Sequence, residues 1–347
     1  MKKLTWLALM LSMVLIVAGC GGGSKNGGNT NEAEDNGAGA TDEKKVKIAI
    51  SQIIEHPSLD ATREGFLAAL KDGGFEEGKN LEVDFNNAQG EQPNNLSIAE
   101  KLATAKNDLV LGIATPSAQA VVNKVKDTPI LFAAVTDPLA AKIVDNLDKP
   151  SGNVTGASDT NPEAIKQLMD FIAANFPKVK TLGLVINEGE TNAVIMADIA
   201  EEALEKHGIK LVRAAVTNTS EVQQAAQSLV GRADAYFTTL DNMVVSGVDA
   251  ILKSAKENKM PYFSSDRETV EKGALATVGF KYYDHGYQVG QMAVEILKNG
   301  KKPSELPVTV PDKLDLIINT KTAAEQGIEI TEAMKSGMKD PEQNLIK

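Results

Sequence analysis

Short apolar runs of five or six residues alternate along this chain with longer segments in which apolar residues recur every three or four positions. The short runs are typical of strands buried on both faces of a parallel sheet, and the longer segments of helices with one buried face. The first series predicts strands at Val46–Ser51, Leu81–Phe85, Leu109–Ile113 and Pro129–Ala133. Alternation of this kind predicts an α/β fold, with a parallel sheet covered by helices on both faces.

A second series begins after a turn cluster at Lys149–Asn153 and predicts strands at Leu182–Ile186, Leu211–Val216, Ala235–Phe237 and Pro261–Phe263. Three more apolar segments, Val154–Asp159, Ala274–Gly279 and Leu314–Ile318, are expected to carry the chain between the two halves. We therefore expect two Rossmann-like lobes joined by three crossover strands, a hinged clamshell with its ligand between the lobes. The expected N-terminal lobe is 45–155 plus 281–312, and the C-terminal lobe is 156–280 plus 313–347.

The first residues predict export. Lys2 and Lys3 precede an apolar run, 4–18, that is shorter than the roughly 20 residues of a membrane-spanning helix. The sequence 17–20, Val-Ala-Gly-Cys, resembles a lipobox, which implies a signal peptide over 1–19 and lipidation of Cys20 on the outer face of the cytoplasmic membrane. A plain signal peptide and an uncleaved anchor are the alternatives. Residues 20–44 lack periodicity and are expected to form a flexible tether.

Charge and cysteine content exclude several classes of protein. Removal of residues 1–19 takes away two lysines and no acid, leaving 34 basic against 47 acidic residues, which argues against a nucleic-acid partner. Cys20 is the only cysteine, so the folded part has no disulfide and no cysteine nucleophile. The three histidines lack the spacing of a zinc site. We expect no cofactor, no metal and no catalytic residue.

Several predicted strands end in a polar residue followed by a proline that suits the first turn of a helix. In the clearest case Thr115 is expected to cap a helix that Pro116 opens, which leaves the backbone N–H groups of Ser117 and Ala118 free for an anion. The pairs His56-Pro57 and Asp137-Pro138 repeat this arrangement. The alternative is that these are ordinary strand-to-helix turns.

Nine segments, in the order of the chain, resemble one family: QIIEHPSLDATREGF, NNAQGE, IATPSAQA, AVTDP, SGNVTG, TNTSEVQQAAQSLVGR, TTLDNMV, SSDRE and GALATVGFKYYDHGYQVG. They are similar to ABC-transporter substrate-binding lipoproteins of the group with tryptophan- and tyrosine-binding members, in the periplasmic-binding-protein type 1 class. The resemblance covers about residues 46–330. It implies a non-enzymatic, monomeric binder that delivers a free amino acid, aromatic or otherwise apolar, to an ABC permease and its ATPase subunit. A sugar or nucleoside binder, a ligand-presenting surface receptor and an exported hydrolase are the alternatives.

An amino acid needs hydrogen-bond donors for its carboxylate and acceptors for its ammonium group. The helix starts after 113 and 135 could supply the donors, while Asp241 and Asp266 follow strand ends in the second lobe and could hold the ammonium group. Each aspartate could instead cap a helix. His56 could hydrogen-bond or stack on the ligand, or only precede Pro57. The expected ligand contacts are Glu55, His56, Asn87, Gln89, Thr115, Ser117, Ala118, Thr136, Asp137, Asn187, Asp241 and Asp266.

Overall fold

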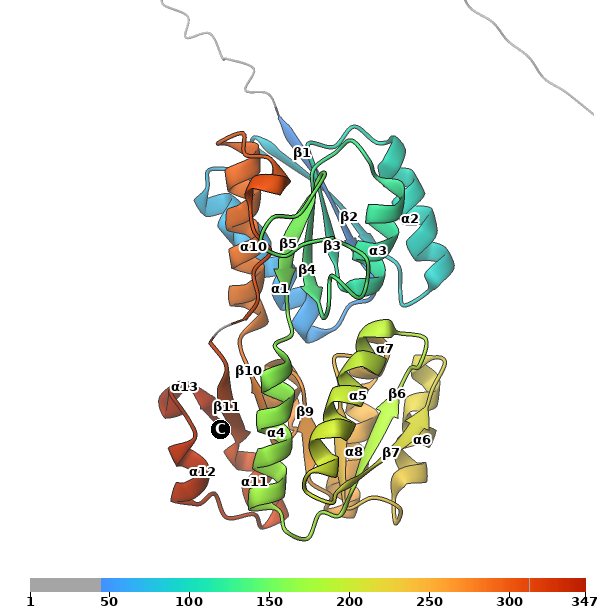
Figure 1. Cartoon of the computed structure of the whole chain (residues 1–347), viewed down its shortest axis with the longest axis vertical. Helices are drawn as coiled ribbons and strands as arrows, with labels where there is room; N and C mark the ends of the chain where they lie inside the picture. The colour runs from blue at the N-terminus through green and yellow to red at the C-terminus, as the bar shows by residue number, and fades with distance from the viewer. Residues whose placement is uncertain (1–44, 312) are drawn as a thin grey trace, which may run out of the picture. The chain divides into compact units, whose positions relative to one another are not determined.

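The computed structural model describes residues 45–311 and 313–347, which form two α/β lobes (Figure 1). The predicted signal peptide, Cys20 and the predicted tether lie outside the described residues. No helix within the described ranges combines the length and the apolar character that a membrane span requires.

The first lobe is built on a five-stranded parallel sheet with the strand order β2-β1-β3-β4-β5. Its strands are β1 (Val46–Gln52), β2 (Leu81–Asn87), β3 (Leu109–Ile113), β4 (Ile130–Val135) and β5 (Val154–Ser158). Its helices are α1 (Pro57–Asp72), α2 (Gln92–Thr104), α3 (Thr115–Lys124) and α10 (Tyr282–Leu297), followed by a 3-10 turn at Pro303–Glu305.

The first lobe has one hydrophobic core on each face of its sheet, and alternate residues of β1 contribute to both. Ile48 and Ile50 pack with α1 and α10 on one face, whereas Ala49 packs with α2 and α3 on the other. Figure 1 shows these two pairs of helices on either side of the sheet. Helices α1 and α10 approach closely because glycines lie at their contact: a Cβ on Gly286 would overlap the carbonyl oxygen of Thr62, and one on Gly65 that of Tyr283. Through this contact α10, which follows strands of the second lobe in the sequence, packs as part of the first lobe.

The second lobe has a seven-stranded sheet with the order β12-β11-β10-β9-β8-β6-β7, in which only the β10–β11 pair is antiparallel among the described residues. Its strands are β6 (Thr181–Ile186), β7 (Lys210–Ala215), β8 (Ala235–Thr238), β9 (Tyr262–Ser264), β10 (Ala276–Gly279), β11 (Asp315–Asn319) and β12 (Leu345–Ile346). Its helices are α4 (Pro162–Asn175), α5 (Thr191–Glu205), α6 (Val222–Leu229), α7 (Asn242–Ser246), α8 (Val248–Asn258), α9 (Arg267–Lys272), α11 (Thr320–Gln326), α12 (Glu332–Ser336) and α13 (Pro341–Asn344), with a 3-10 turn at Thr219–Glu221.

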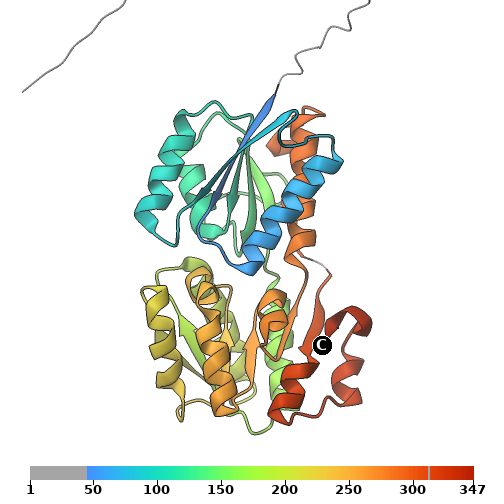
Figure 2. The same ribbon diagram turned by 180° about the vertical axis from the view of Figure 1, so that it is seen from behind.

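Alternate strand residues again face different helices. Leu184 and Phe237 pack with α4 and α5, while Val185 and Tyr236 pack with α6 and α8. The helices α6 and α8 lie in front in Figure 2, the view from behind. Two layers of helices around each sheet confirm the α/β clamshell that the sequence predicts.

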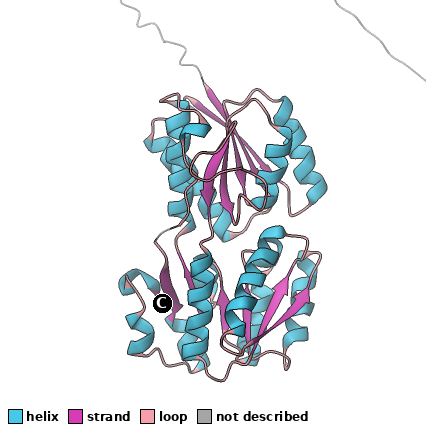
Figure 3. Ribbon diagram, in the orientation of Figure 1, coloured by secondary structure: helices cyan, strands magenta, loops and turns pink. Residues whose placement is uncertain are grey.

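Three short connections join the lobes: one after β5, one between β10 and α10, and one before β11 (Figure 3). The segments expected to cross are themselves strands of the two sheets. β5 pairs with β4 as far as Ser158, three residues beyond the expected lobe boundary at 155, and β10 pairs with β9 and β11 in the second sheet. Each of these apolar segments pairs with a neighbouring strand of one lobe, and the chain crosses between the lobes directly after β5 and β10 and directly before β11.

Candidate functional site

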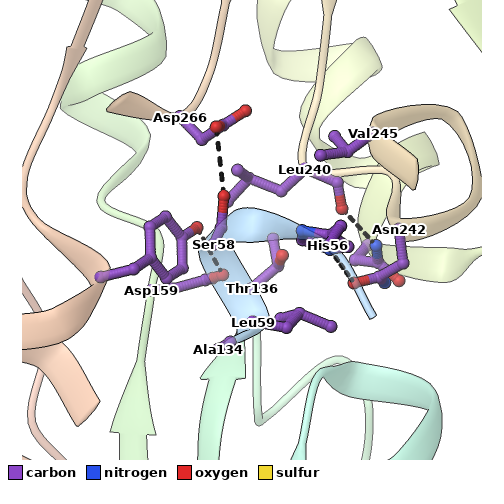
Figure 4. Close-up of a pocket in the computed structure, with 12 residues that line it drawn as sticks. His56, Ser58, Leu59, Ala134, Thr136, Asp159, Leu240, Asn242, Val245 and Asp266 are labelled. Atoms are coloured by element: carbon purple, nitrogen blue, oxygen red, sulfur yellow. Dashed lines mark hydrogen bonds between the residues drawn. The ribbon is translucent and has the colours of Figure 1, made fainter. Parts of the chain in front are cut away.

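A small cavity lies where the two lobes meet, and both lobes and the connections between them line it (Figure 4). Its lining residues are His56, Ser58, Leu59, Ala134, Thr136, Asp159, Asn192, Leu240, Asn242, Val245, Asp266 and Tyr282. Its volume is about 10 Å³, which is about the space of one water molecule. In the arrangement described, the lobes therefore meet around a cavity that is too small for an amino acid.

The start of α1 supplies hydrogen-bond donors from the first lobe. His56 precedes the helix without capping it through its side chain, and Pro57 occupies the first turn. The backbone N–H groups of Ser58 and Leu59 in that turn have no acceptor within the helix, and both residues line the cavity. Orphan N–H groups and the positive end of the helix dipole favour an anionic group at this point.

Asp266 faces this helix start from the second lobe. Its Oδ1 accepts a hydrogen bond from Ser58 Oγ across the gap between the lobes, at 3.1 Å. The same carboxylate caps α9 by accepting from Thr269 N, and Ser264 Oγ donates to its other oxygen at 2.8 Å. Asp266 is only 1 % exposed. Its carboxylate thus serves as a helix cap and as a polar wall of the cavity.

A second contact between the lobes joins His56 and Asn242, with 3.5 Å between His56 Nε2 and Asn242 Oδ1. Asn242 is held by the carboxylate of Glu190, which accepts from Asn242 Nδ2 at 2.6 Å, from Asn242 N at 3.1 Å and from Met243 N at 3.1 Å. Burial lowers the pKa of His56, partly offset by the nearby Asp266 carboxylate. The imidazole is therefore neutral near pH 7.

Buried acids surround Tyr282 at the connections between the lobes. The Tyr282 hydroxyl donates to Asp159 Oδ2 at 3.0 Å, and the Tyr282 backbone N–H donates to Glu268 Oε1 at 3.1 Å. Burial raises the pKa of Asp159 to about 6, and burial together with the neighbouring Asp266 raises the pKa of Glu268 to about 8. His285 accepts from Ala134 N at 3.0 Å, and burial lowers its pKa to about 4. A cationic partner would stabilise the ionised forms of Asp159 and Glu268, which burial disfavours. Asp159 lines the cavity, where such a partner could bind.

A second cavity adjoins the first, because Asp159 and Leu240 line both. Its other walls are mainly apolar and come from α4, α5, β10 and the connections after β10 and before β11: Ala164, Ile165, Leu168, Met196, Val278, Gly279, Phe280 and Leu314, with Thr160, Asn161 and Ser265 as the polar members. A polar cavity beside an apolar one suits a ligand with a charged end and an apolar end.

The structure brings His56, Thr136 and Asp266 together in the cavity lining, from the residues expected to contact a ligand. The helix start after β3 is arranged otherwise than expected. Ala114, with φ of 75°, is the N-cap in place of Thr115, and Ala118 N donates to Ala114 O. Thr115 Oγ1 accepts from Thr136 N, and Ser117 Oγ donates to Asn95. These hydroxyls are used inside the first lobe, and none of the three expected residues lines the cavity.

Asp241 is the N-cap of α7 and accepts from Val244 N at 3.0 Å and from Asn187 N at 2.5 Å. Burial and the neighbouring Glu190 raise its pKa well above the usual range. Asp241 does not line the cavity, whereas Asn242 does. Asp241 therefore acts as a helix cap, the alternative stated for it above, and the neighbouring Asn242 faces the cavity in its place.

The other expected contacts lie at the edge of the first lobe or in helix starts. Asn87 Nδ2 donates to Glu55 at 3.1 Å, and Gln89 N donates to Asn87 Oδ1 at 2.7 Å. Asp137 accepts from the backbone of Leu139 and Ala140, as a cap does. None of these residues lines the cavity.

Several lining residues were not expected, among them Ser58, Asp159, Asn192 and Asn242. Ser58 directly follows the pair His56-Pro57, so the same helix-start motif that indicates His56 also indicates Ser58. Asp159 could not be found in this way because its role depends on a connection between the lobes.

Comparison with known proteins places the chain in a family. Residues 47–339 match the family model described as ABC transporter substrate binding protein. The chain is 41 % identical, over 91 % of its length and 90 % of the relative's, to a protein of Clostridioides difficile named tyrosine-binding protein. It is also similar to the ABC domain from Streptococcus pneumoniae in complex with L-Trp, with 35 % identity, a TM-score of 0.80 and coverage of 85 % and 99 % of the two chains.

A further solved structure informs on lobe closure. The ligand-free, open structure of a substrate-binding protein with adhesive properties from Clostridium difficile is 42 % identical and covers 87 % of this chain and 98 % of its own, yet its TM-score is 0.62. The L-Trp complex is less identical and superposes better. The lobes of this chain therefore lie closer to the arrangement in the complex than to the open one, in agreement with the contacts across the cavity. On the extent of the family match and of these identities, the chain belongs to the family of ABC transporter substrate-binding proteins.

Proposed function

We propose that the chain is the extracytoplasmic binding component of an ABC importer and that it captures a free amino acid, aromatic or otherwise apolar, between its lobes. The observation that carries the proposal is the pairing of the α1 helix start with the Asp266 carboxylate across the cavity. A group of donors opposite a buried acid is complementary to a zwitterion. The names of two relatives, a tyrosine-binding protein and an L-Trp complex, support the same ligand class.

In this proposal the ligand carboxylate binds at the start of α1, where the N–H groups of Ser58 and Leu59 and the hydroxyls of Ser58 and Thr136 are donors. The ammonium group binds to the carboxylates of Asp266 and Asp159. Hydrogen bonds between ionised groups are roughly twice as strong as neutral ones. Bound ammonium also favours the ionised form of Asp159, whose pKa burial raises to about 6.

The ligand side chain extends into the adjoining apolar cavity, against Leu240, Met196 and Phe280. Each square ångström of apolar surface removed from water contributes about 25 cal/mol, so an aromatic side chain gains more there than a small one. The chain without residues 1–19 contains no tryptophan, which counts against a sugar ligand that would stack on indole rings.

Ligand binding and lobe closure are coupled through Ser58 and Asp266, which contact each other directly in the structure. Ser58 and Asp266 satisfy each other in the closed lobes, and a zwitterion would insert between them and bind both. A ligand that contacts both lobes favours the closed arrangement by its difference in affinity for the two states. The closed form would then deliver the amino acid to a permease with its ATPase subunit, with no reaction catalysed by this chain.

The rest of the assembly is proposed from the sequence. Cys20 carries the lipid after removal of residues 1–19, and residues 20–44 tether a monomeric body to the outer face of the cytoplasmic membrane. Its lobes comprise 45–155 plus 281–312 and 156–280 plus 313–347, with β5 extending the first to Ser158.

A thermal-shift screen of the purified chain against the twenty amino acids, a set of sugars and a set of nucleosides tests the ligand class. A ligand that binds only the folded state at 100 times its Kd stabilises by about 2.7 kcal/mol. We expect stabilisation by one or a few apolar amino acids. Stabilisation by a sugar or nucleoside alone would contradict the proposal.

A further inference from the structure

The contact between His56 and Asn242 fixes which nitrogen of the imidazole carries the proton. Asn242 Nδ2 lies 2.6 Å from a Glu190 carboxylate oxygen. A carboxylate that also accepts from two backbone N–H groups must face a donor there, so the amide nitrogen points to Glu190. The amide oxygen of Asn242 consequently faces His56.

This orientation makes His56 Nε2 the donor of the pair, since Asn242 Oδ1 can only accept. A neutral imidazole has one N–H, so Nδ1 then carries a lone pair and no proton. Nδ1 is buried and has no hydrogen-bond partner within the part of the chain that the structure describes. The side chain as a whole is 7 % exposed and lines the cavity between the lobes (Figure 4).

Resting on the proposed function, we infer that His56 Nδ1 accepts a hydrogen bond from the ligand ammonium group, and that Glu190, acting through Asn242, is the positioning residue that holds the imidazole in this tautomer. The acceptor set for the ammonium group is then Asp266, Asp159 and His56. Asp266 and Asp60 contribute negative charge near the imidazole and Lys272 contributes positive charge. Burial outweighs these charges and keeps His56 neutral.

An acceptor without charge has a consequence for selectivity. A buried nitrogen lone pair that is left without a donor costs free energy, so the site rejects an analogue of the right shape that lacks the amine. The desamino analogue of tyrosine, 3-(4-hydroxyphenyl)propionate, keeps the carboxylate and the ring and lacks only the ammonium group.

Nitrogen NMR of the ¹⁵N-histidine-labelled chain tests the inference, because the protein has only three histidines and the exposed His207 can be assigned from His207→Gln. The free protein should show His56 protonated on Nε2. Addition of L-tyrosine, or of whichever amino acid binds in the screen, should shift His56 Nδ1 upfield as a lone pair that accepts a hydrogen bond, while Nε2 keeps its proton. The desamino analogue should leave Nδ1 unshifted.

Variants separate the positioning role from a structural one. Asn242→Ala should abolish the preference for the Nε2–H tautomer, whereas Glu190→Gln, which keeps a carbonyl oxygen opposite Asn242, should retain it. His56→Leu should weaken tyrosine about tenfold more than it weakens the desamino analogue.

The outcomes distinguish this inference from the proposed function. Amino-acid binding with His56 protonated on Nδ1, or with an unshifted Nδ1, would overturn the inference and leave the proposed function standing. Equal weakening of both ligands in His56→Leu would likewise overturn it. Failure of every amino acid to bind the wild-type chain would overturn both.

Discussion

Ser58 Oγ, in the first turn of α1, lies 3.1 Å from Oδ1 of Asp266, the residue that caps α9 in the opposite lobe. The two residues are 208 positions apart in the chain. Each lies just after a strand, and the two strands belong to different sheets. Their contact closes the gap between the lobes at the point where donors of one lobe meet an acid of the other. In the proposed function this is where the amino acid binds, so variants at these positions test the site.

Replacement of Asp266 by asparagine should weaken amino-acid binding without unfolding the protein. Asparagine is a good N-cap, so α9 keeps its cap, but the charge opposite the ammonium group is lost. Loss of a charge-assisted hydrogen bond costs about 1.5–3 kcal/mol, or roughly ten- to a hundredfold in Kd, as isothermal titration calorimetry would show. Asp340→Asn, the same change at the N-cap of α13 in the C-terminal region, is the matched control and should bind normally. Equal Kd values for Asp266→Asn and wild type would remove Asp266 from the site.

Replacement of Leu240 by alanine tests the apolar end of the site. Leu240 lines both cavities, so the change removes apolar contact from the ligand side chain. Affinity for an aromatic amino acid should fall by about 1–2 kcal/mol, or roughly five- to thirtyfold. Leu252→Ala, in α8 and away from both cavities, is the control. If the two variants bound aromatic amino acids equally well, the side chain would have to lie elsewhere.

Glu268 predicts a pH dependence of stability. Its pKa in the folded chain is raised to about 8 by burial, with the carboxylates of Asp266 and Glu271 adding to the effect and the Tyr282 N–H opposing it. Above pH 4.5, the ordinary pKa of a glutamate, the unfolded state loses the Glu268 proton, whereas the folded state keeps it. Binding of this proton therefore stabilises the folded state. The stabilisation is complete below pH 4.5 and is lost as the pH rises through 8.

Glutamine at position 268 mimics the protonated acid and removes this dependence. We expect the Tm of wild type relative to Glu268→Gln to decrease steadily between pH 5 and pH 8.5, as measured by calorimetry. A constant difference in Tm over this range would show that Glu268 is ionised in the folded chain throughout.

Gly286 should not tolerate even a methyl group. A Cβ there would overlap the Thr62 carbonyl oxygen of α1, so Gly286→Ala must push α10 away from α1. We expect a loss of about 1–3 kcal/mol in the free energy of unfolding, measured by urea denaturation. Gly337→Ala, where the nearest atom to an added Cβ is 3.7 Å away, is the control and should be close to neutral. Equal stability of the two variants would mean that α1 and α10 can separate at little cost.

The apolar runs specify several strands well because runs such as those of β3 and β4 are buried on both faces. β3 occupies the residues predicted for it, and the helix start after β1 lies beside the cavity as the motif suggests. The site itself depends on which strand ends meet across the gap, and this is not readable from one strand at a time. Ala114, with its positive φ, is the N-cap of α3, one residue before the expected cap. The side-chain hydroxyls in the first turn of α3 consequently form hydrogen bonds inside the first lobe. The choice between Asp241 and Asn242 likewise depends on Glu190, which lies 52 residues before Asn242 in the chain.

Asp159 is a second case in which the local sequence does not indicate a role in the site. Its sequence neighbourhood is that of an ordinary strand end, and only the return of α10 brings Tyr282 to its carboxylate. A residue that lies on a connection between lobes has neighbours that are set by lobe closure, so local patterns do not reveal its role.

Native mass spectrometry identifies the ligand that the two lobes bind. The chain is incubated with an equimolar mixture of amino acids, sugars and nucleosides, and the mass added to the folded protein is read. We expect one dominant adduct with the mass of an apolar or aromatic amino acid, strongly reduced in Asp266→Asn and retained in Asp340→Asn. An adduct with the mass of a sugar or nucleoside, or an amino-acid adduct that Asp266→Asn leaves unchanged, would contradict it.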